Sequence, residues 1–97
     1  MHMMKFEYLS IDKVFNANDD LFKEILKDNS KLSCPIIKKM SLLCNKDFTA
    51  LINNKRIKIK KELGFEMNHN DPKIQSFKII DDAVSVYALI AYTAKEV

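Results

Sequence analysis

The stretch Asp71 to Val97, DPKIQSFKIIDDAVSVYALIAYTAKEV, decides the fold because it can form either a long helix or a buried strand. Asp71-Pro72 is typical of a helix start, with a capping carboxylate followed by a residue that needs no N–H partner. We predict a long helix here because apolar residues recur at alternating steps of three and four. These residues are Ile74, Phe77, Ile80, Val84, Tyr87 and Ala91.

The same stretch has a second interpretation, which stays open. Residues Val84 to Tyr92 are nearly all β-favouring, so a break at Asp81-Asp82 could be followed by a strand. A central strand paired with Lys5–Ile11 would bury both of its faces within one chain. The alternative therefore places the end of the chain in the middle of a sheet.

Upstream of this stretch, the patterns favour a short extended segment and then a helix. Residues 5–15, KFEYLSIDKVF, are rich in β-formers and predict a short strand or an arm. Asn18-Asp19-Asp20 offers capping side chains and acids for the positive end of a helix dipole. A helix over residues 19–28 is predicted because four apolar residues share one face: Leu21, Phe22, Ile25 and Leu26.

The middle of the chain is predicted to form further short helices. Ser33 can cap one of them, with Pro35 in its first turn, and Lys46–Asn53 forms the next. Phe48 and Leu51 would face its core side. Lys55–Leu63 alternates like a strand at its start, but Gly64 is typical of a helix C-cap and favours a helix. The predicted fold class is mainly α, a small bundle of about five helices with a short N-terminal strand or arm.

Composition limits the classes of protein that fit this chain. Ninety-seven residues with 47% hydrophobic content suit a single domain over residues 1–97 with one modest core. The charged fraction of 30% and the single Gly argue against disorder and against a turn-rich all-β sandwich. No run approaches the ~18 apolar residues that span a membrane, and no signal peptide is visible. We expect a cytoplasmic protein without a membrane partner, in which residues 1–4 look like a start codon and cloning remnant.

Metal binding and catalysis have little support in the sequence. Cys34 and Cys44 lie ten residues apart with only His69 as a further soft ligand, so we expect buried thiols and no metal or cofactor. His69 lies in a polar loop. Asp81 and Asp82 would point about 100° apart on a helix and so would not form a paired carboxylate site. With no phosphate loop or activated nucleophile motif, we expect no catalytic residues and no enzyme activity.

Charge is the clearest functional signal. Residues 31–61 carry nine Lys or Arg against one acid, Asp47, whereas the whole chain has a net charge of only +3. A segregated positive field of this size favours a polyanion or an acidic protein surface as partner.

Part of this basic segment resembles a known family. The similar positions are Leu32-Ser33, Ile37, Leu43-Cys44 and, most clearly, the run Phe48-Thr49-Ala50-Leu51-Ile52-Asn53-Asn54-Lys55-Arg56. They resemble the Cro/repressor-type (XRE-like) helix-turn-helix family, including its small antitoxin members, over about residues 20–66. The chain departs from the family's pattern at Lys38, where a small residue is usual, and at Leu42, where Gly is usual.

The resemblance implies a helix-turn-helix core over residues 19–66 that reads duplex DNA. Asn45, Lys46 and Ala50 would contact bases in the major groove. The basic face would contact phosphates through the following residues: Lys38, Lys39, Lys55, Arg56, Lys58, Lys60 and Lys61.

Residues 71–97 are predicted to associate with a second copy, because a helix that is apolar over more than one face needs another surface to cover it. The residues assigned to this contact are Phe77, Ile80, Val84, Tyr87, Leu89 and Ile90. The predicted function is a small DNA-binding regulator of the repressor or antitoxin kind, acting as a homodimer. The alternative is a small protein-binding inhibitor or immunity-type module whose basic face docks on an acidic partner.

Overall fold

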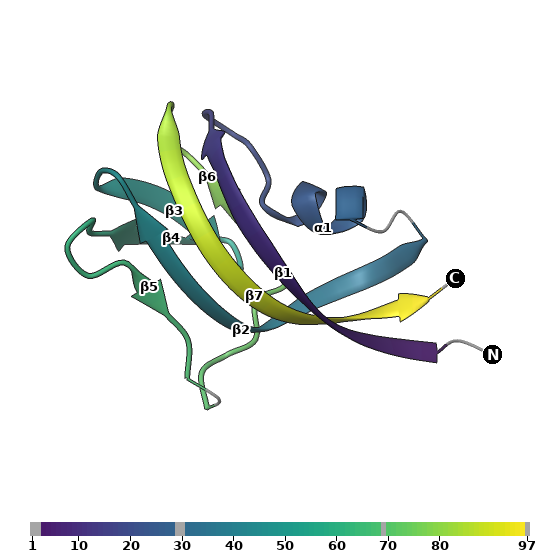
Figure 1. Ribbon diagram of the computed structural model, residues 1–97. Coiled ribbons are helices and arrows are strands. Elements are labelled where there is room, and N and C mark those ends of the chain that lie inside the picture. The colour runs from purple at the N-terminus through teal and green to yellow at the C-terminus, as the bar shows by residue number, and fades with distance from the viewer. Residues whose placement is uncertain (1–2, 29–30, 69, 97) are drawn as a thin grey trace.

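The computed structural model describes residues 3–28, 31–68 and 70–96, and it is built mainly from strands (Figure 1). Met1, His2 and His69 lie outside the described residues. The elements in chain order are β1 (Met3–Phe15), α1 (Phe22–Asp28), β2 (Leu32–Cys44), β3 (Phe48–Ile52), β4 (Lys55–Ile59), β5 (Phe65–Glu66), β6 (Phe77–Ile79) and β7 (Val84–Glu96).

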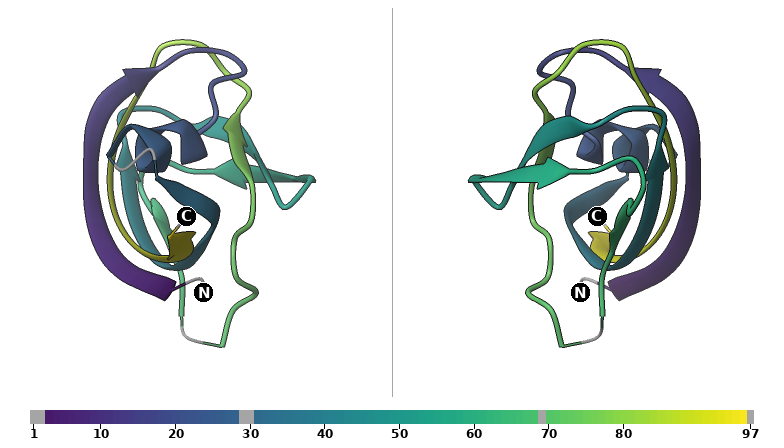
Figure 2. Two further views of the ribbon diagram at one scale, coloured as in Figure 1. Left: turned by 90° about the vertical axis from the view of Figure 1, so that its right-hand side faces the viewer. Right: turned by 90° about the vertical axis from the view of Figure 1, so that its left-hand side faces the viewer.

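Four of the strands form a large antiparallel sheet in the order β1-β7-β2-β5. The last strand, β7, lies in its interior and pairs with β1 through thirteen consecutive residue pairs, from Met3 opposite Glu96 to Phe15 opposite Val84. Its other edge pairs with β2. The long strands curve strongly, so the sheet has a concave and a convex side (Figure 2).

The concave side of the large sheet is covered by two separate elements. A small sheet with the order β4-β3-β6 lies across it, and α1 lies beside that sheet within the same curve (Figure 2). The core fills the space between these layers. Its largest fully buried side chains include Phe15, Phe48, Phe77 and Tyr92, which come from four different strands.

Residues 84–96 form a strand paired with β1, so the predicted long helix over residues 71–97 is wrong and the alternative strand is confirmed. The expectation that both faces of this strand are buried is wrong, because Tyr87 and Leu89 leave one face partly exposed. Val84, Val86, Ala88, Ile90, Tyr92 and Ala94 are all buried, at every second position of β7. This period of two is that of a strand with one face on a core. The predicted break at Asp81-Asp82 is present, because residues 81–83 bend and Ala83 has a φ of 55° before the strand begins.

The predicted mainly α fold class is wrong in the middle of the chain as well, because strands form there in place of helices. The helices expected from Ser33 onward, over Lys46–Asn53 and over Lys55–Leu63 are the strands β2, β3 and β4. β3 and β4 contain several β-branched or aromatic residues, which pack well on a pleated surface, whereas β2 has only Ile36 and Ile37 of these types. Pro35 is accommodated because the pairing of β2 with β7 shifts its register between Ser33 and Ile36, where no N–H is needed.

Two sequence predictions near the N-terminus are confirmed. The strand or arm over residues 5–15 is β1, and the helix over 19–28 is present as α1, although it begins at Phe22. Asp20 caps it, since its Oδ1 accepts the N–H of Phe22 at 2.9 Å. Phe22 and Ile25 bury the apolar face of α1. No helix in the described part of the chain is long and apolar enough to cross a membrane.

The scarcity of Gly does not prevent a turn-rich β fold, contrary to expectation. Asn18, Asn53 and Asn54 all have positive φ, a conformation that Asn tolerates better than most residues. Asn53 and Asn54 connect β3 to β4 as a two-residue hairpin loop, and positive φ at both positions is characteristic of a type I′ turn. Gly64, with a φ of 64°, closes the turn after β4 and is too near the carbonyl of Leu42 to admit a Cβ.

Burial differs from expectation at two other places. Phe48 is buried as predicted, but Leu51 is only half-buried, because it points to the opposite face of β3. Cys34 is exposed rather than buried, and Cys44 is half-buried; both are free thiols.

Neighbouring positions in β7 provide a test of the strand assignment. Ile90 is fully buried whereas Leu89 is 46% exposed. Ile90→Ala should lower the free energy of unfolding by about 2–5 kcal/mol, because it leaves a cavity in a packed core. Leu89→Ala, the matched control, should cost less than about 1 kcal/mol. Urea denaturation of both variants measures the difference, and equal costs would contradict the alternating burial.

The hairpin loop provides a second test. Asn53 Oδ1 accepts the N–H groups of Gln75 (2.7 Å) and Ser76 (3.2 Å), and its Nδ2 donates to the carbonyl of Lys73 (2.9 Å). Both Asn53→Ala and Asn54→Ala place Ala at positive φ, but only the first also removes these bonds. Asn53→Ala should therefore be about 1 kcal/mol or more less stable than Asn54→Ala by thermal or urea unfolding. The prediction fails if Asn54→Ala is the more damaging change.

Candidate functional site

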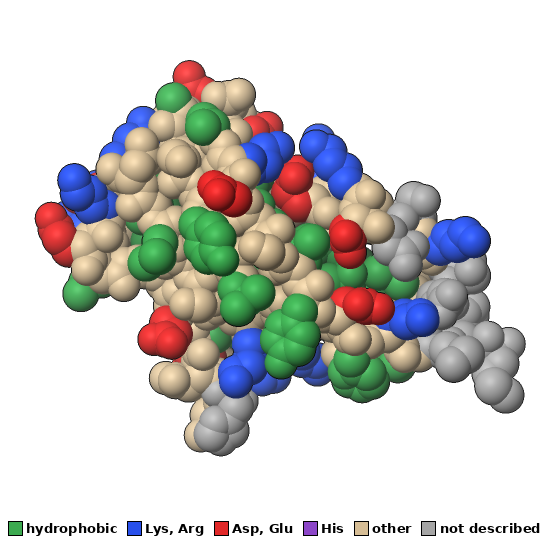
Figure 3. Space-filling model, viewed as in Figure 1, with side chains coloured by type: hydrophobic (Ala, Val, Ile, Leu, Met, Phe, Trp, Pro, Cys, Tyr) green, Lys and Arg blue, Asp and Glu red, His purple; other side chains and the backbone are tan. Residues whose placement is uncertain are grey.

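Large apolar side chains are exposed on the convex side of the large sheet. Phe6 and Tyr8 on β1 are 77% and 75% exposed, and Leu43 on β2 is 61% exposed. Tyr87 and Leu89 on β7 are 48% and 46% exposed. We call these five residues the apolar face. The space-filling view shows hydrophobic side chains grouped near the middle of the molecular surface (Figure 3).

The strand register makes the apolar face continuous. Leu43 lies opposite Tyr87, so β2 and β7 contribute one contiguous pair. Tyr8 lies opposite Ala91 and is therefore diagonal to Leu89 across the β1–β7 ladder. Opposite and diagonal side chains on one face of a sheet are close enough to contact. The five side chains thus form one patch across three adjacent strands.

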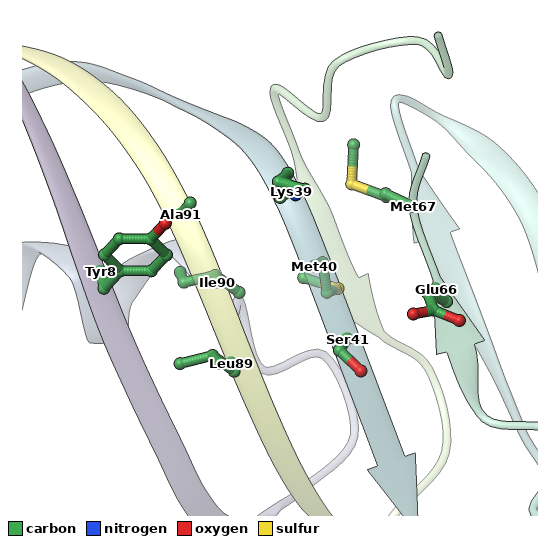
Figure 4. A pocket seen from close by; sticks show the side chains of 9 residues that line it. All are labelled: Tyr8, Lys39, Met40, Ser41, Glu66, Met67, Leu89, Ile90 and Ala91. Atoms are coloured by element: carbon green, nitrogen blue, oxygen red, sulfur yellow. The ribbon is translucent and has the colours of Figure 1, made fainter. Parts of the chain in front are cut away.

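A shallow hollow of about 210 Å³ opens beside Tyr8 on this face. Tyr8 and Leu89 border it on one side, and Glu66 and Met67 border it on the other (Figure 4). Lys39 completes the polar part of the rim. The remaining lining residues are Met40, Ser41, Ile90 and Ala91. A hollow of this size suits one apolar side chain of a partner, with polar groups within reach of its edge.

The residues predicted to read DNA bases do not form a shared surface. Ala50 is fully buried in β3 and cannot contact any partner. Asn45 Oδ1 accepts the N–H of Ser85 at 2.9 Å, and Lys46 Nζ donates to the carbonyl of Asp82 at 2.6 Å. Asn45 therefore bonds the β2–β3 turn to the start of β7, and Lys46 bonds it to the loop before β7. The expected recognition helix and the helix-turn-helix core over residues 19–66 are not formed, because these positions belong to β3 and to the turn preceding it.

The seven basic residues predicted to contact phosphates lie on several different surfaces. Lys38 is half-buried and Lys39 exposed on β2, whereas Lys55, Arg56 and Lys58 are exposed on β4. Arg56 lies opposite Leu51, which in turn lies opposite Lys78 of β6. Arg56, Lys58 and Lys78 therefore share the outward side of the small sheet, and we call these three residues the basic face.

The remaining two basic residues lie just after β4, next to an acid. Lys60 pairs with Asp47 at 3.4 Å, and the backbone N–H of Lys61 donates to the other oxygen of Asp47 at 2.9 Å. The N–H of Lys61, followed by the side chain of Lys60, holds the pKa of Asp47 below its ordinary value. Asp47 consequently stays ionised and partly neutralises this end of the basic segment.

The residues predicted for self-association are also divided. Phe77, Val84 and Ile90 are buried in the core, and Ile80 is half-buried. These four cannot serve a dimer contact in the predicted way, because a strand directs alternate residues to opposite faces. Tyr87 and Leu89 are the two members of this set that lie exposed on the apolar face.

Sequence reasoning missed Phe6, Tyr8 and Leu43 as surface residues. The signal was present in residues 5–15, where Phe6 and Tyr8 occupy one side of an alternating strand and Leu9 and Ile11 the other. It was hard to use because both sides are partly apolar. Leu43 gave no such signal, since its segment was interpreted as a helix.

A larger groove of about 510 Å³ lies between the small sheet and residues 65–74. Its apolar walls include Ile52, Ile57 and Phe65, and its charged residues are Lys55, Glu66 and Asp71. Because charges of both signs occur, the groove does not select a ligand of one charge. Within the described ranges, no three His, Cys, Asp or Glu side chains gather closely enough to hold a metal ion.

Two polar side chains are buried near the end of β7. The hydroxyl of Thr93 has no hydrogen-bond partner among the residues that the structure describes, and the buried hydroxyl of Tyr92 interacts with the carboxylate of Asp28. Burial raises the pKa of Tyr92, and the carboxylates of Asp28 and Glu7 act in the same direction, so this phenol stays neutral. Burial likewise raises the pKa of Cys44. None of these three residues lines the hollow beside Tyr8.

Comparisons of the chain with protein-family models, with curated proteins and with solved structures gave no match. The apolar face and the basic face are therefore the two candidate sites, and both are defined by geometry alone. The apolar face is the more continuous of the two.

The Asp47 contact gives a testable pH effect. NMR titration should find the pKa of Asp47 below the ordinary aspartate value, and Lys60→Gln should recover only part of the shift, because the backbone N–H of Lys61 remains. Since the folded-state pKa is depressed, the contact stabilises the fold above the unfolded-state pKa. This stabilisation is lost as the pH falls through the folded-state value. Full recovery of the ordinary pKa in Lys60→Gln would show that the side chain is the main cause.

Proposed function

We propose that this protein is a small protein-binding module that docks the apolar face on a partner protein. The observation that carries the proposal is the exposure of Phe6, Tyr8, Leu43, Tyr87 and Leu89 on three adjacent strands. An antiparallel sheet with one side in water normally presents polar residues there. A contiguous exposed apolar patch with a polar rim is a common mark of a protein interaction site.

The chemistry of the face favours a protein over a small ligand. Its two tyrosines are of a type enriched at interfaces, where a ring can bury its body and keep its hydroxyl in contact with water. The hollow beside Tyr8 can accept one protruding side chain, while Lys39 and Glu66 supply polar contacts of both signs at its rim. The partner surface should be mainly apolar, with one projecting apolar residue. We also propose a reducing location such as the cytoplasm, which the free thiols of Cys34 and Cys44 support.

A second candidate function uses the basic face and an acidic protein surface. Arg56, Lys58 and Lys78 project from neighbouring strands of the small sheet, and none of the three has an ion-pair partner within the described residues. Such a group attracts acidic surfaces and is weakened by salt. Duplex DNA binding stays a prediction from the charge of residues 31–61, without the recognition helix on which it was based.

A pull-down with matched variants distinguishes these functions. The apolar-face variant carries Tyr87→Ser and Leu89→Ser, and the basic-face variant carries Arg56→Gln, Lys58→Gln and Lys78→Gln. A partner retained from the native cell extract by the wild type is identified, purified and titrated against all three proteins. We expect the apolar-face variant to bind it with a Kd raised by about tenfold or more, because both side chains lie near the centre of the patch.

The controls determine how the result is interpreted. The basic-face variant should keep the partner with a nearly unchanged Kd, and both variants should unfold at temperatures close to the wild type, since their changes lie on the surface. If the basic-face variant loses the partner and the apolar-face variant keeps it, the second candidate is correct. A mobility shift with random duplex DNA that weakens steeply with salt, and that requires the basic face, would support DNA binding instead.

A further inference from the structure

β1 is a long strand at the edge of the large sheet, and one of its edges has no partner. It occupies the first place in the order β1-β7-β2-β5, and no strand in the described ranges pairs with its outer side. Proteins usually protect such an edge with a short strand, Pro, a bulge or lysines, because its free N–H and C=O groups can pair with another chain. β1 has thirteen residues without Pro, and its pairing with β7 continues without a register shift.

The other edges differ from β1 in this respect. β5 and β6 have two and three residues, and β4 has five, three of which are the cations Lys55, Arg56 and Lys58. Short or lysine-rich edges resist strand addition. By contrast, the charges of β1 are evenly divided between Lys5, Lys13 and the acids Glu7 and Asp12. Among the edges formed by β1, β4, β5 and β6, that of β1 is thus the one suited to accept a full-length strand.

We propose that two copies of this chain pair antiparallel through β1, with the two-fold axis passing beside Ser10. In this register Ser10 of one copy lies opposite Ser10 of the other, and the two large sheets become one. The inference does not depend on the proposed function of the apolar face, because the pairing is made by backbone groups at the edge of the sheet; Phe6 is the one residue of the apolar face that it also uses.

Side-chain complementarity selects this register. With the axis at Ser10, Glu7 of each copy lies opposite Lys13 of the other, which gives two opposite-charge pairs. Phe6 lies opposite Val14 twice, and Leu9 lies opposite Ile11 twice. Cross-strand pairs of these kinds stabilise a sheet, whereas like charges directly opposite destabilise it. The remaining facing pairs are Lys5 with Phe15 and Tyr8 with Asp12, so the self-complementarity of β1 in the antiparallel direction depends on the three kinds of pair named above.

Neighbouring registers give less favourable pairs of facing side chains. An axis at Leu9 would place Lys5 opposite Lys13, and an axis at Ile11 would place Glu7 opposite Phe15 and Lys13 opposite Leu9. An axis at Tyr8 would place Glu7 opposite Leu9. Registers centred between two residues would put convex-side residues opposite concave-side residues, which a pleated sheet does not permit without turning every side chain over.

The surroundings of β1 fit a second strand. Phe6 and Val14 are 77% and 55% exposed in the single copy, and each would gain an apolar neighbour from the other copy. A groove of about 380 Å³ lies between residues 9–13 of β1 and the α1 residues Glu24, Lys27 and Asp28. Lys13 contacts Glu24 at 3.2 Å, and its ammonium has three donors, so it can bond Glu7 of the other copy as well.

Cysteine cross-linking tests the register directly. In a background with Cys34→Ser and Cys44→Ala, we expect Ser10→Cys to form a disulfide-linked dimer under mild oxidation at ~100 μM. Directly opposite Cα atoms in an antiparallel pair lie about 4.5–5.5 Å apart, which is within the range of a disulfide. Tyr8→Cys and Asp12→Cys are the matched controls on the same side of β1. Each control should remain mostly uncross-linked alone, and an equimolar mixture of the two should cross-link, because these positions lie opposite each other.

Charge reversal provides a second measurement that needs no cysteine. By light scattering, the wild type should be a dimer at ~100 μM, and Glu7→Lys and Lys13→Glu should each raise the dimer Kd by about tenfold or more through like-charge contacts. An equimolar mixture of these two variants should recover the dimer, because every facing pair is then oppositely charged. Circular dichroism melting shows that each variant is folded.

Three outcomes would overturn the proposal. The first is a wild type that stays monomeric at ~100 μM, and the second is Ser10→Cys cross-linking no better than both controls. The third is a dimer that survives both charge reversals but is lost with Tyr87→Ser and Leu89→Ser, which would place the contact on the apolar face. The last result would support docking through that face while excluding the β1 edge.

Discussion

The pairing of β7 with β1 on one side and β2 on the other is the interaction on which the rest of the structure depends. β7 is the last strand in the sequence but an interior strand of the large sheet. Its buried residues Val84, Val86, Ala88 and Ile90 form the side of the core that belongs to the large sheet. The small sheet and α1 both depend on packing against these residues, because a hairpin of two five-residue strands and a seven-residue helix are too short to be stable alone. Burial against β7 and its neighbours is what stabilises them.

The same arrangement explains why apolar side chains remain on the outside. A chain of this length can cover one side of a curved four-stranded sheet, and here the small sheet and α1 cover the concave side. The described chain supplies no further layer for the convex side. The apolar face and the unpaired edge of β1 therefore have a common origin, since both are parts of the large sheet that no other element covers. Their proposed partners differ because a face is recognised by side chains and an edge by backbone groups.

Particular residues show how much of this was predictable from the sequence. β1, α1 and the break at Asp81-Asp82 follow from local patterns that tertiary contacts do not override. The C-terminal strand was obscured because Tyr87 and Leu89 are apolar although they are exposed, so the period of two was hidden and steps of three and four could be found instead. The predicted helix over Lys46–Asn53 ends at the first of two Asn residues, although two Asn residues between alternating segments are a hairpin signal. Of the candidate site, Tyr87 and Leu89 were named in advance; Phe6, Tyr8 and Leu43 depend on strand pairing that local patterns do not specify.

The topology also makes the proposed functions depend on the pairing of β1 with β7. Phe6 and Tyr8 come from the first strand and Tyr87 and Leu89 from the last, so the apolar face exists only after both ends have met. Before β7 is in place, β1 and β2 lack the strand that separates them, and loop closure across nearly the whole chain must precede that pairing. During this interval both edges of the self-complementary strand β1 are unpaired. A second copy that pairs with one side would still leave the other available for β7, so the proposed dimer is compatible with completion of the fold, whereas strand addition on the β7 side would block it.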